Sequence, residues 1–148
     1  IGPAGMVGGQ VLDMGLSGKR PTLAAIQEMH RKKTGMLIAA AAELGAIAAR
    51  APDLRREKVR AWGLALGACF QAVDDLLDVT SDKAALGKTP GKDAAQNKPT
   101  LVAALGVDGT RRYAHAQGEH ARVLAVELGG DSSALALQMV GFLLDRRS

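Results

Sequence analysis

FQAVDDLLD, residues 70–78, ends a long apolar run that is typical of a buried helix, and it places three carboxylates within five residues. On a helix, Asp74 and Asp78 are i,i+4 neighbours on one face, where like charges repel each other. Such a pair is tolerated when water solvates it or when it holds a cation. Oxygen ligands without Cys or His beside them favour a hard cation, Mg²⁺ or alternatively Mn²⁺, over zinc.

The connector after Asp78 strengthens the cation hypothesis. Residues 79–100 are rich in glycine and proline, which break regular structure. Mg²⁺ is commonly bound by one or two carboxylates plus substrate phosphates, and lysines neutralise phosphates as point charges. The pattern therefore predicts a Mg²⁺–diphosphate site, with an ordinary solvated loop as the alternative. The lysines of this connector are Lys83, Lys88, Lys92 and Lys98.

A third feature is a lysine on an apolar stripe. Such a lysine is costly unless it is paired, or else its stem lies along the surface and its ammonium reaches solvent. The pair Thr34-Gly35 predicts a kink in this helix, which would aim Lys33 and Thr34 into the interior. The periodicity predicts a helix over residues 22–50 with an inward stripe of Ile26, Met29, Lys33, Met36 or Leu37, Ala40, Leu44 and Ile47.

Four segments, in this order and spacing, resemble the motifs of the trans-isoprenyl diphosphate synthases, the polyprenyl synthetase family with its farnesyl and geranylgeranyl diphosphate synthases. The resemblance extends from residue 5 to about residue 106. It implies an all-α isoprenoid synthase fold, a helical bundle around a central cavity. The segments are GMVGGQVLDM (5–14), HRKKTGMLIAAAAELGA (30–46), FQAVDDLLD (70–78) and LGKTPGKDAAQNKPT (86–100).

The resemblance also implies roles for single residues. Asp74 and Asp78 match the second aspartate-rich motif, which binds Mg²⁺ on the allylic diphosphate, with Asp75 supporting them. The remaining matches are Lys33 and Thr34 as contacts of that diphosphate at a helix kink, Gln71 beside the metal-bound diphosphate, Lys88 in a loop that closes over the phosphates, Lys98 as a second basic residue, Asp93 near the metal, Gln10 and Asp13 of the GGQ segment, and Phe70 in the tunnel for the prenyl tail.

The implied function is Mg²⁺-dependent prenyl transfer. An allylic diphosphate ionises, isopentenyl diphosphate attacks the carbocation, and a proton leaves without a dedicated side-chain base. His30, His115 and His120 are accordingly expected to be surface residues. Two alternatives stay open: a non-catalytic subunit that modulates a partner synthase, and a class I terpene cyclase-like diphosphate lyase. The intact DDLLD segment argues against the first, and the lack of an N-D-x-x-S-x-x-x-E segment argues against the second.

The family's first aspartate-rich motif has no counterpart in this chain, and neither do the upstream basic residues that hold isopentenyl diphosphate. We therefore expect the C-terminal half of a synthase, present as its C-terminal helices in one domain over residues 1–148. Such a half would offer half of the metal site, without full turnover on its own. The resemblance further suggests a homodimer.

Composition agrees with a helical protein. Hydrophobic residues make up 47% and aromatic residues only 3%, so Ala, Leu, Val and Met must build the core. These residues include strong helix formers. Gly129-Gly130 is expected to separate the last two helices. We expect helices near residues 3–16, 22–50, 54–80, 99–106, 108–128 and 132–146.

Cys69, the single cysteine, lies on an apolar stripe with Trp62, Leu66 and Val73, so we expect it to be buried and the protein to reside in a reducing cytoplasm. No apolar run is long enough to predict a membrane span. The net charge of +4 does not predict nucleic-acid binding, because the lysines are not interleaved with aromatic residues and no binding motif appears.

Overall fold

The computed structural model describes the chain over residues 1–86 and 98–146, with side chains over 1–80 and 98–146. Over these ranges the chain is helical and contains no strand, which confirms the all-α prediction. Within the same ranges, no helix combines the length and hydrophobicity needed to cross a bilayer. The elements are α1 (Met6–Leu16), α2 (Leu23–His30), the π-helix η1 (Arg31–Gly35), α3 (Met36–Ala48), α4 (Asp53–Leu86), α5 (Leu101–Leu128) and α6 (Gly130–Leu144).

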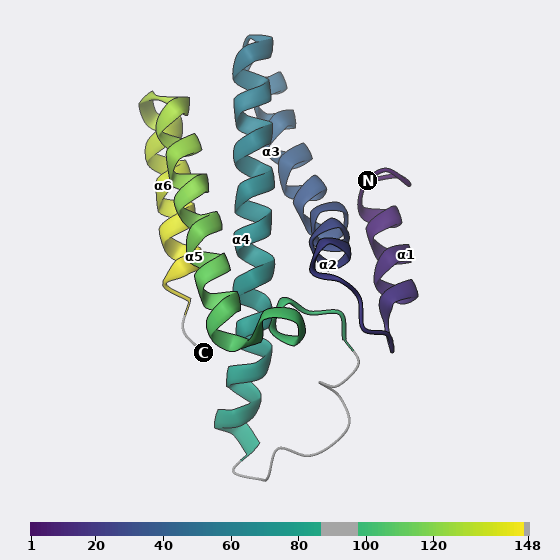
Figure 1. Cartoon of the computed structure of the whole chain (residues 1–148). Helices are drawn as coiled ribbons and strands as arrows, with labels where there is room; N and C mark the ends of the chain where they lie inside the picture. Colours follow the sequence, from purple (N-terminus) through teal and green to yellow (C-terminus); the bar gives the residue numbers. More distant parts are fainter. Residues whose placement is uncertain (87–97, 147–148) are drawn as a thin grey trace.

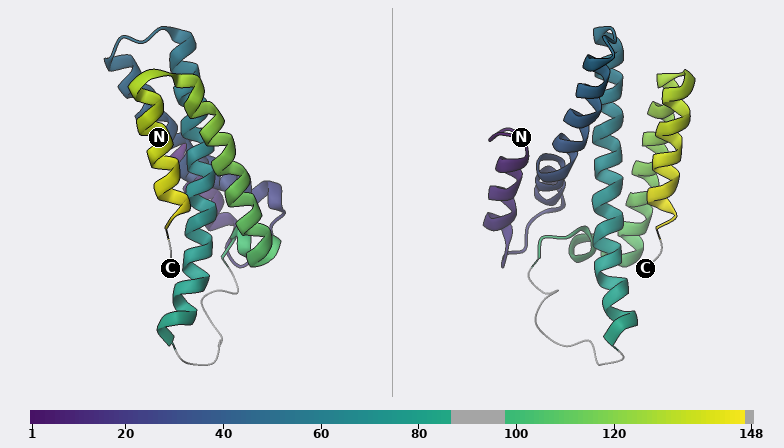
Figure 2. Two further views of the ribbon diagram at one scale, coloured as in Figure 1. Left: turned by 90° about the vertical axis from the view of Figure 1, so that its left-hand side faces the viewer. Right: turned by 180° about the vertical axis from the view of Figure 1, so that it is seen from behind.

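The long helix α4 is the centre of the arrangement (Figure 1). α5 and α6 lie along one side of α4, and η1 and α3 lie along the other, with α1 outermost. The view from behind shows the same order of helices (Figure 2). The segments that carry Lys33 and the aspartates, which are distant in sequence, therefore lie side by side.

Two clusters of buried side chains hold α4 in place. One cluster, around Trp62, Leu66 and Val140, joins α4 to α5 and α6. The other, around Ile26 and Cys69, joins α4 to α2 and α5. The apolar stripe predicted on α4 is therefore buried, and Cys69 is fully buried as expected.

The kink predicted at Thr34-Gly35 is a π-helical turn, since Arg31–Gly35 form η1 between α2 and α3. A π turn holds more residues than an α turn, so it shifts the helix face that follows it. The buried face continues from η1 through Ala39. The prediction of Leu44 and Ile47 as inward residues is therefore wrong: they are 65% and 45% exposed.

The last turns of α4 differ from the prediction. The helix expected over residues 54–80 continues to Leu86. The prediction that the connector begins at residue 79 is therefore wrong. The physical reason is local: residues 79–86 include good helix formers, and the first helix breaker after Asp78 is Gly87. Lys88, Lys92 and Asp93 lie outside the described residues.

Glycines with positive φ mark the ends of the last helical segments. The two helices expected over 99–106 and 108–128 form one element, α5, which is broken at Gly106 with φ 70°. Gly129, with φ 67°, separates α5 from α6 as predicted. Positive φ costs glycine little because it has no Cβ.

Two glycines of α4 allow close packing of the neighbouring helix. A Cβ added at Gly63 would lie 2.6 Å from Cα of Ala39, and one added at Gly67 would lie 2.7 Å from Cα of Gly35. Gly67 and Gln71 are i,i+4 neighbours on one face of α4. The glycine at position 67 therefore brings η1 within reach of Gln71.

Gly67→Ala is expected to destabilise the chain by about 1–3 kcal/mol, because the new methyl group meets a backbone atom that cannot move aside. The matched control is Gly45→Ala in α3, where an added Cβ meets nothing within 4 Å. That change should stabilise the helix by about 0.5–1 kcal/mol. Thermal unfolding followed by circular dichroism should show Tm shifts of opposite sign, and equal shifts would contradict the close contact.

Candidate functional site

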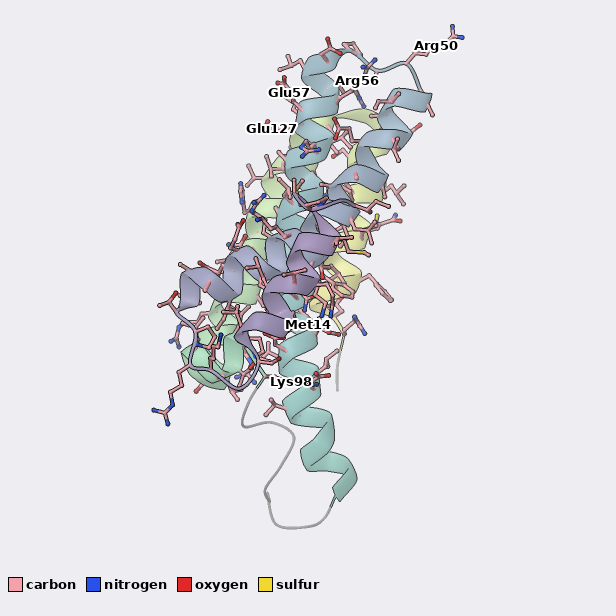
Figure 3. The ribbon with its side chains drawn as sticks, turned by 90° about the vertical axis from the view of Figure 1, so that its right-hand side faces the viewer. Met14, Arg50, Arg56, Glu57, Lys98 and Glu127 are labelled. Atoms are coloured by element: carbon pink, nitrogen blue, oxygen red, sulfur yellow. The ribbon has the colours of Figure 1, made fainter. Side chains whose placement is uncertain are left out.

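One face of α4 carries polar residues of the FQAVDDLLD segment. Gln71, Asp74 and Asp78 follow each other at i, i+3 and i+7, so they line up along this acidic face. Asp74 is partly buried and Asp78 is exposed. Nζ of Lys98 lies 3.9 Å from Oδ2 of Asp78, and Figure 3 shows Lys98 beside the lower part of α4. A lysine from the end of the connector thus lies next to the acidic face.

The π turn is joined to the acidic face by a hydrogen bond. Oγ1 of Thr34 donates to Oε1 of Gln71 at 2.6 Å, in a partly buried position. Gly67 permits this approach, because its missing Cβ lets η1 pack against α4. Thr34, Gln71, Asp74 and Asp78 therefore contribute to one continuous surface.

Lys33 is paired, as its place on an apolar stripe requires. Its Nζ lies 2.5 Å from Oδ2 of Asp13, and both side chains are partly buried. Gly9, one turn before Asp13 on α1, packs on the backbone of Lys33, and an added Cβ would come within 2.7 Å of the Lys33 Cβ. The GGQ-x-x-D spacing thus has a physical basis: Gly9 allows the helices to meet, and Asp13 reaches the ammonium group.

Asp75 points away from solvent. It is 6% exposed, and its Oδ2 accepts a hydrogen bond of 2.7 Å from the backbone N–H of Leu101, the first residue of α5. Burial raises the pKa of the Asp75 carboxyl to about 7, against the opposing effect of the Leu101 N–H, and the charges of Asp74 and Asp78 raise it further. Asp75 therefore lies at the junction of two helices.

His30 is a residue whose place the sequence reasoning missed. The expectation of a surface histidine is wrong for His30, which is 7% exposed with Nε2 4.0 Å from Oδ2 of Asp75. Burial lowers the pKa of His30 to about 4. Because burial lowers the pKa of His30 and raises that of Asp75, both shifts favour the neutral forms and the contact is not an ion pair. The sequence could have indicated this burial through its helical spacing, since His30 lies four residues after Ile26, which was predicted on the inward face. His115 and His120 are exposed, as expected.

The remaining predicted residues lie elsewhere or beyond the described chain. Phe70 packs against the cluster of α5 and α6, and the guanidinium of Arg146 lies over its ring at 5.7 Å. Gln10 is exposed on α1. Lys88 and Asp93 lie outside the described residues, so their assigned roles stay predictions.

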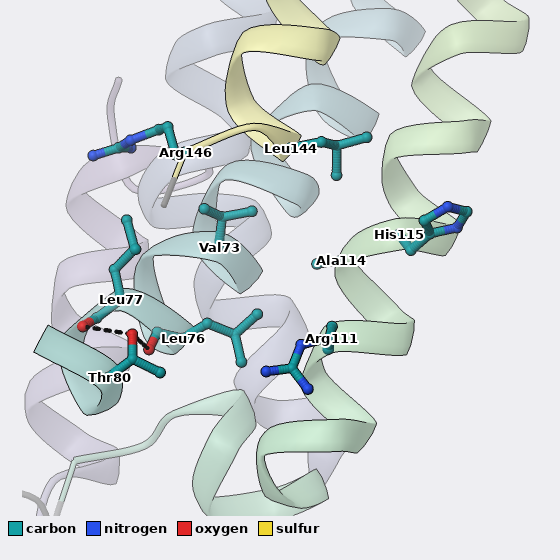
Figure 4. A pocket seen from close by; sticks show the side chains of 9 residues that line it. All are labelled: Val73, Leu76, Leu77, Thr80, Arg111, Ala114, His115, Leu144 and Arg146. Atoms are coloured by element: carbon teal, nitrogen blue, oxygen red, sulfur yellow. Dashed lines mark hydrogen bonds between the residues drawn. The ribbon is translucent and has the colours of Figure 1, made fainter. Parts of the chain in front are cut away.

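Two surface grooves of the described chain do not contain Asp74 or Asp78. One groove of about 510 Å³ lies between α4, α5 and the C-terminal end of α6 (Figure 4). Its α4 residues are rotated by roughly a third of a turn from Asp74 and Asp78. A second groove of about 510 Å³ opens between α2, α4 and α5 beside His30. The first groove is lined by Val73, Leu76, Leu77, Thr80, Arg111, Ala114, His115, Leu144 and Arg146.

The donor set of the acidic face suits a hydrated hard cation. Among the side chains that the structure describes, no group of three or more His, Cys, Asp or Glu forms a complete metal cage. Mg²⁺ does not require one, because it usually keeps several waters and binds one or two carboxylates plus substrate phosphates. Asp74 and Asp78 supply that number of carboxylates on one face, and Asp78 is open to water. The residues present therefore fit a Mg²⁺ ion that a diphosphate also ligates.

Comparison with known proteins gives a consistent result. The polyprenyl synthetase family model matches residues 4–124. The chain is 41% identical to farnesyl diphosphate synthase of Escherichia coli (strain K12), over 90% of this chain and 46% of that protein. It is 34% identical to the heterodimeric geranylgeranyl pyrophosphate synthase large subunit 1, chloroplastic, of Arabidopsis thaliana, over 100% of this chain and 41% of that protein.

The solved structures agree with the sequence relatives. The structure of geranyltransferase from Helicobacter pylori, complexed with magnesium and isoprenyl diphosphate, matches with a TM-score of 0.75 and 30% identity, over 95% of this chain and 46% of that one. The chain thus spans less than half the length of each of these three proteins. Its sequence motifs, family match and helical arrangement lead to one assignment: the chain belongs to the polyprenyl synthetase family and has the isoprenoid synthase fold.

Proposed function

We propose that this chain supplies the allylic-diphosphate side of a Mg²⁺-dependent prenyltransferase that makes short-chain isoprenyl diphosphates of the farnesyl or geranylgeranyl type. The observation that carries the proposal is the hydrogen bond from Thr34 to Gln71, which joins the π turn to the acidic face. Carboxylates that suit a metal and groups that suit phosphate then share one surface.

Each residue of this surface has a role that follows from its chemistry. Asp74 and Asp78 offer oxygen ligands to the metal, which when bound neutralises the charge on the departing diphosphate. Oε1 of Gln71 is occupied by Thr34, so its N–H₂ group is the part that donates to a phosphate oxygen. Lys33 and Lys98 add positive charge at two edges of the same surface.

In the proposed reaction the allylic C–O bond breaks and the diphosphate leaves with the electron pair. The double bond of isopentenyl diphosphate then forms a C–C bond to the allylic carbon, and a proton is lost to the released diphosphate. The residues of this chain bind and orient the leaving group, so their contribution is electrostatic. The site for isopentenyl diphosphate and the tunnel role of Phe70 belong to this proposal as predictions.

The two alternatives are separable from this proposal. Membership of the polyprenyl synthetase family favours prenyl transfer over the diphosphate lyase chemistry of a class I terpene cyclase. A non-catalytic subunit would have no need of a working metal–diphosphate surface. Binding measurements on the chain itself therefore distinguish the proposal from the subunit hypothesis.

We also propose finer attributes that follow from the family assignment and from the chemistry of the site. Mg²⁺ would be the working metal, and Mn²⁺ would substitute for it because both prefer oxygen ligands. A homodimer would be the working assembly. A cytoplasmic setting is consistent with the single buried cysteine, which is free of any disulfide.

Calorimetric titration of the chain with geranyl diphosphate, in Mg²⁺ and in EDTA, tests the proposed function. We expect binding only with Mg²⁺, competed by inorganic pyrophosphate. Lys33→Met should weaken the binding of geranyl diphosphate by about 10-fold or more, because the proposed charge-assisted hydrogen bond from the ammonium group to the diphosphate is lost. Lys32→Met is the matched control, since Lys32 pairs with Glu28 at 3.4 Å on the same turn. Equal binding in EDTA, or no binding to a chain with a helical circular dichroism spectrum, would overturn the proposal.

A further inference from the structure

The contact between Asp75 and Leu101 is buried on both sides. Asp75 is 6% exposed and Leu101 is 1% exposed. The first N–H groups of a helix have no partner within the helix, so they need a side chain or water. The cap residue Thr100 accepts from the N–H of Ala103. The Leu101 N–H is bonded instead by Oδ2 of Asp75 at 2.7 Å.

Asp75 also differs from its two acidic neighbours in exposure. Its side chain is 8% exposed, whereas that of Asp78 is 62% exposed. Asp75 is rotated by about 100° from Asp74, which turns its carboxylate toward the start of α5, where it is buried against the Leu101 N–H. Mg²⁺ keeps several waters in its shell. A buried carboxylate with one oxygen bonded to a backbone N–H is poorly placed for such an ion.

The position of Lys98 depends on the same contact. Lys98 precedes Leu101 by three residues, with Pro99 buried between them. The N–H of Thr100 donates to the carbonyl of Lys98 at 2.9 Å, so this short segment is folded rather than extended. Its far end places Nζ of Lys98 at 3.9 Å from Oδ2 of Asp78. Fixing Leu101 therefore fixes the backbone position from which the side chain of Lys98 reaches the acidic face.

We propose that Asp75 is a positioning residue and not a metal ligand: it fixes the start of α5 and thereby sets Lys98 against the acidic face. The second carboxylate of the DDLLD segment then has a different task from the first and the last. The inference rests on the proposed function, because diphosphate binding is its readout. It deepens that function by dividing the three aspartates between metal binding and lysine placement.

Three variants separate the two roles. Asp75→Asn keeps an oxygen that accepts from Leu101 and removes the charge. Asp75→Ala removes the acceptor. Asp74→Asn, on the acidic face, shows how much affinity is lost when a proposed metal ligand is removed. Calorimetry with Mg²⁺ and inorganic pyrophosphate should give Asp75→Asn within about threefold of the native affinity and Asp75→Ala weaker by about 10-fold, since a hydrogen bond is worth roughly that factor. Mn²⁺ affinity should fall in Asp74→Asn alone.

A double-mutant cycle shows whether Asp75 acts through Lys98. Asp75→Ala should weaken pyrophosphate binding in the native background and change it by less than about twofold in a Lys98→Met background, because the residue it positions is gone. Hydrogen exchange should report faster exchange of the Leu101 amide in Asp75→Ala, by about 10-fold, and protection restored in Asp75→Asn. A merely structural role would give additive losses and no rescue by Asn.

The outcomes are distinguishable. Rescue by Asp75→Asn together with a non-additive cycle supports the inference. A loss of Mn²⁺ affinity in Asp75→Asn equal to that of Asp74→Asn overturns it in favour of a third metal ligand. Native binding by Asp75→Ala overturns it as well. If Asp74→Asn itself binds Mg²⁺ and pyrophosphate like the native chain, the proposed function fails first and this inference falls with it.

Discussion

Asp74→Asn is expected to weaken Mg²⁺-dependent pyrophosphate binding by about 100-fold or more, because even groups that only support a metal ligand are worth 10–100-fold. The substitution replaces an ionised carboxylate with a neutral amide of the same shape. Half of the acidic charge on the face of Asp74 and Asp78 is lost. Calorimetry in Mg²⁺, with EDTA as the reference, measures the change.

The same substitution is expected to leave the fold intact or to stabilise it. Asp74 and Asp78 repel each other at i,i+4, and removing one charge relieves about 0.2–0.5 kcal/mol. A loss of binding with an unchanged or higher Tm is therefore diagnostic of a functional carboxylate. The control is Asp53→Asn at the start of α4, about 30 Å away along the same helix. Its pyrophosphate affinity should be native, and a loss equal to that of Asp74→Asn would contradict the site.

The fold was predictable where the burial pattern of a residue depends only on the spacing of side chains along one regular helix. The apolar stripe of Trp62, Leu66, Cys69 and Val73 is buried because its spacing matches the turn of an α-helix. The stripe beyond η1 was not predictable in this way. A π turn changes the register of every later residue, so Leu44 and Ile47 leave the inward face.

The candidate site was predictable in its residue types and less so in its contacts. The spacing of Asp74 and Asp78 and the kink at Thr34-Gly35 are local properties of the sequence. The pairing of Lys33 with Asp13, the hydrogen bond of Thr34 to Gln71 and the burial of His30 depend on which helices become neighbours. Such contacts join residues far apart in the chain, and no local pattern determines them.

His30 and Asp75 are expected to give the stability of the chain two opposite dependences on pH. Burial lowers the pKa of His30 from 6.5 to about 4 and raises that of Asp75 from 3.8 to about 7. As pH falls from 6.5 to 4, the unfolded state binds a proton on His30 that the folded state does not bind. The free energy of unfolding then falls by up to about 3 kcal/mol. As pH rises from about 4 to 7, the unfolded state releases a proton that Asp75 keeps in the folded state, which lowers the free energy of unfolding by up to about 4 kcal/mol.

In the native chain these slopes oppose each other, so each becomes visible when the other group is removed. His30→Gln should give a chain whose free energy of unfolding decreases between about pH 4 and 7. Asp75→Asn should give one whose free energy of unfolding increases over the lower part of that range. Urea unfolding in EDTA across this range measures the difference between the two variants, and the exposed carboxylates common to both cancel in it. Equal slopes in the two variants would contradict the burial of these two groups, because burial moves the pKa of an acid and that of a base in opposite directions.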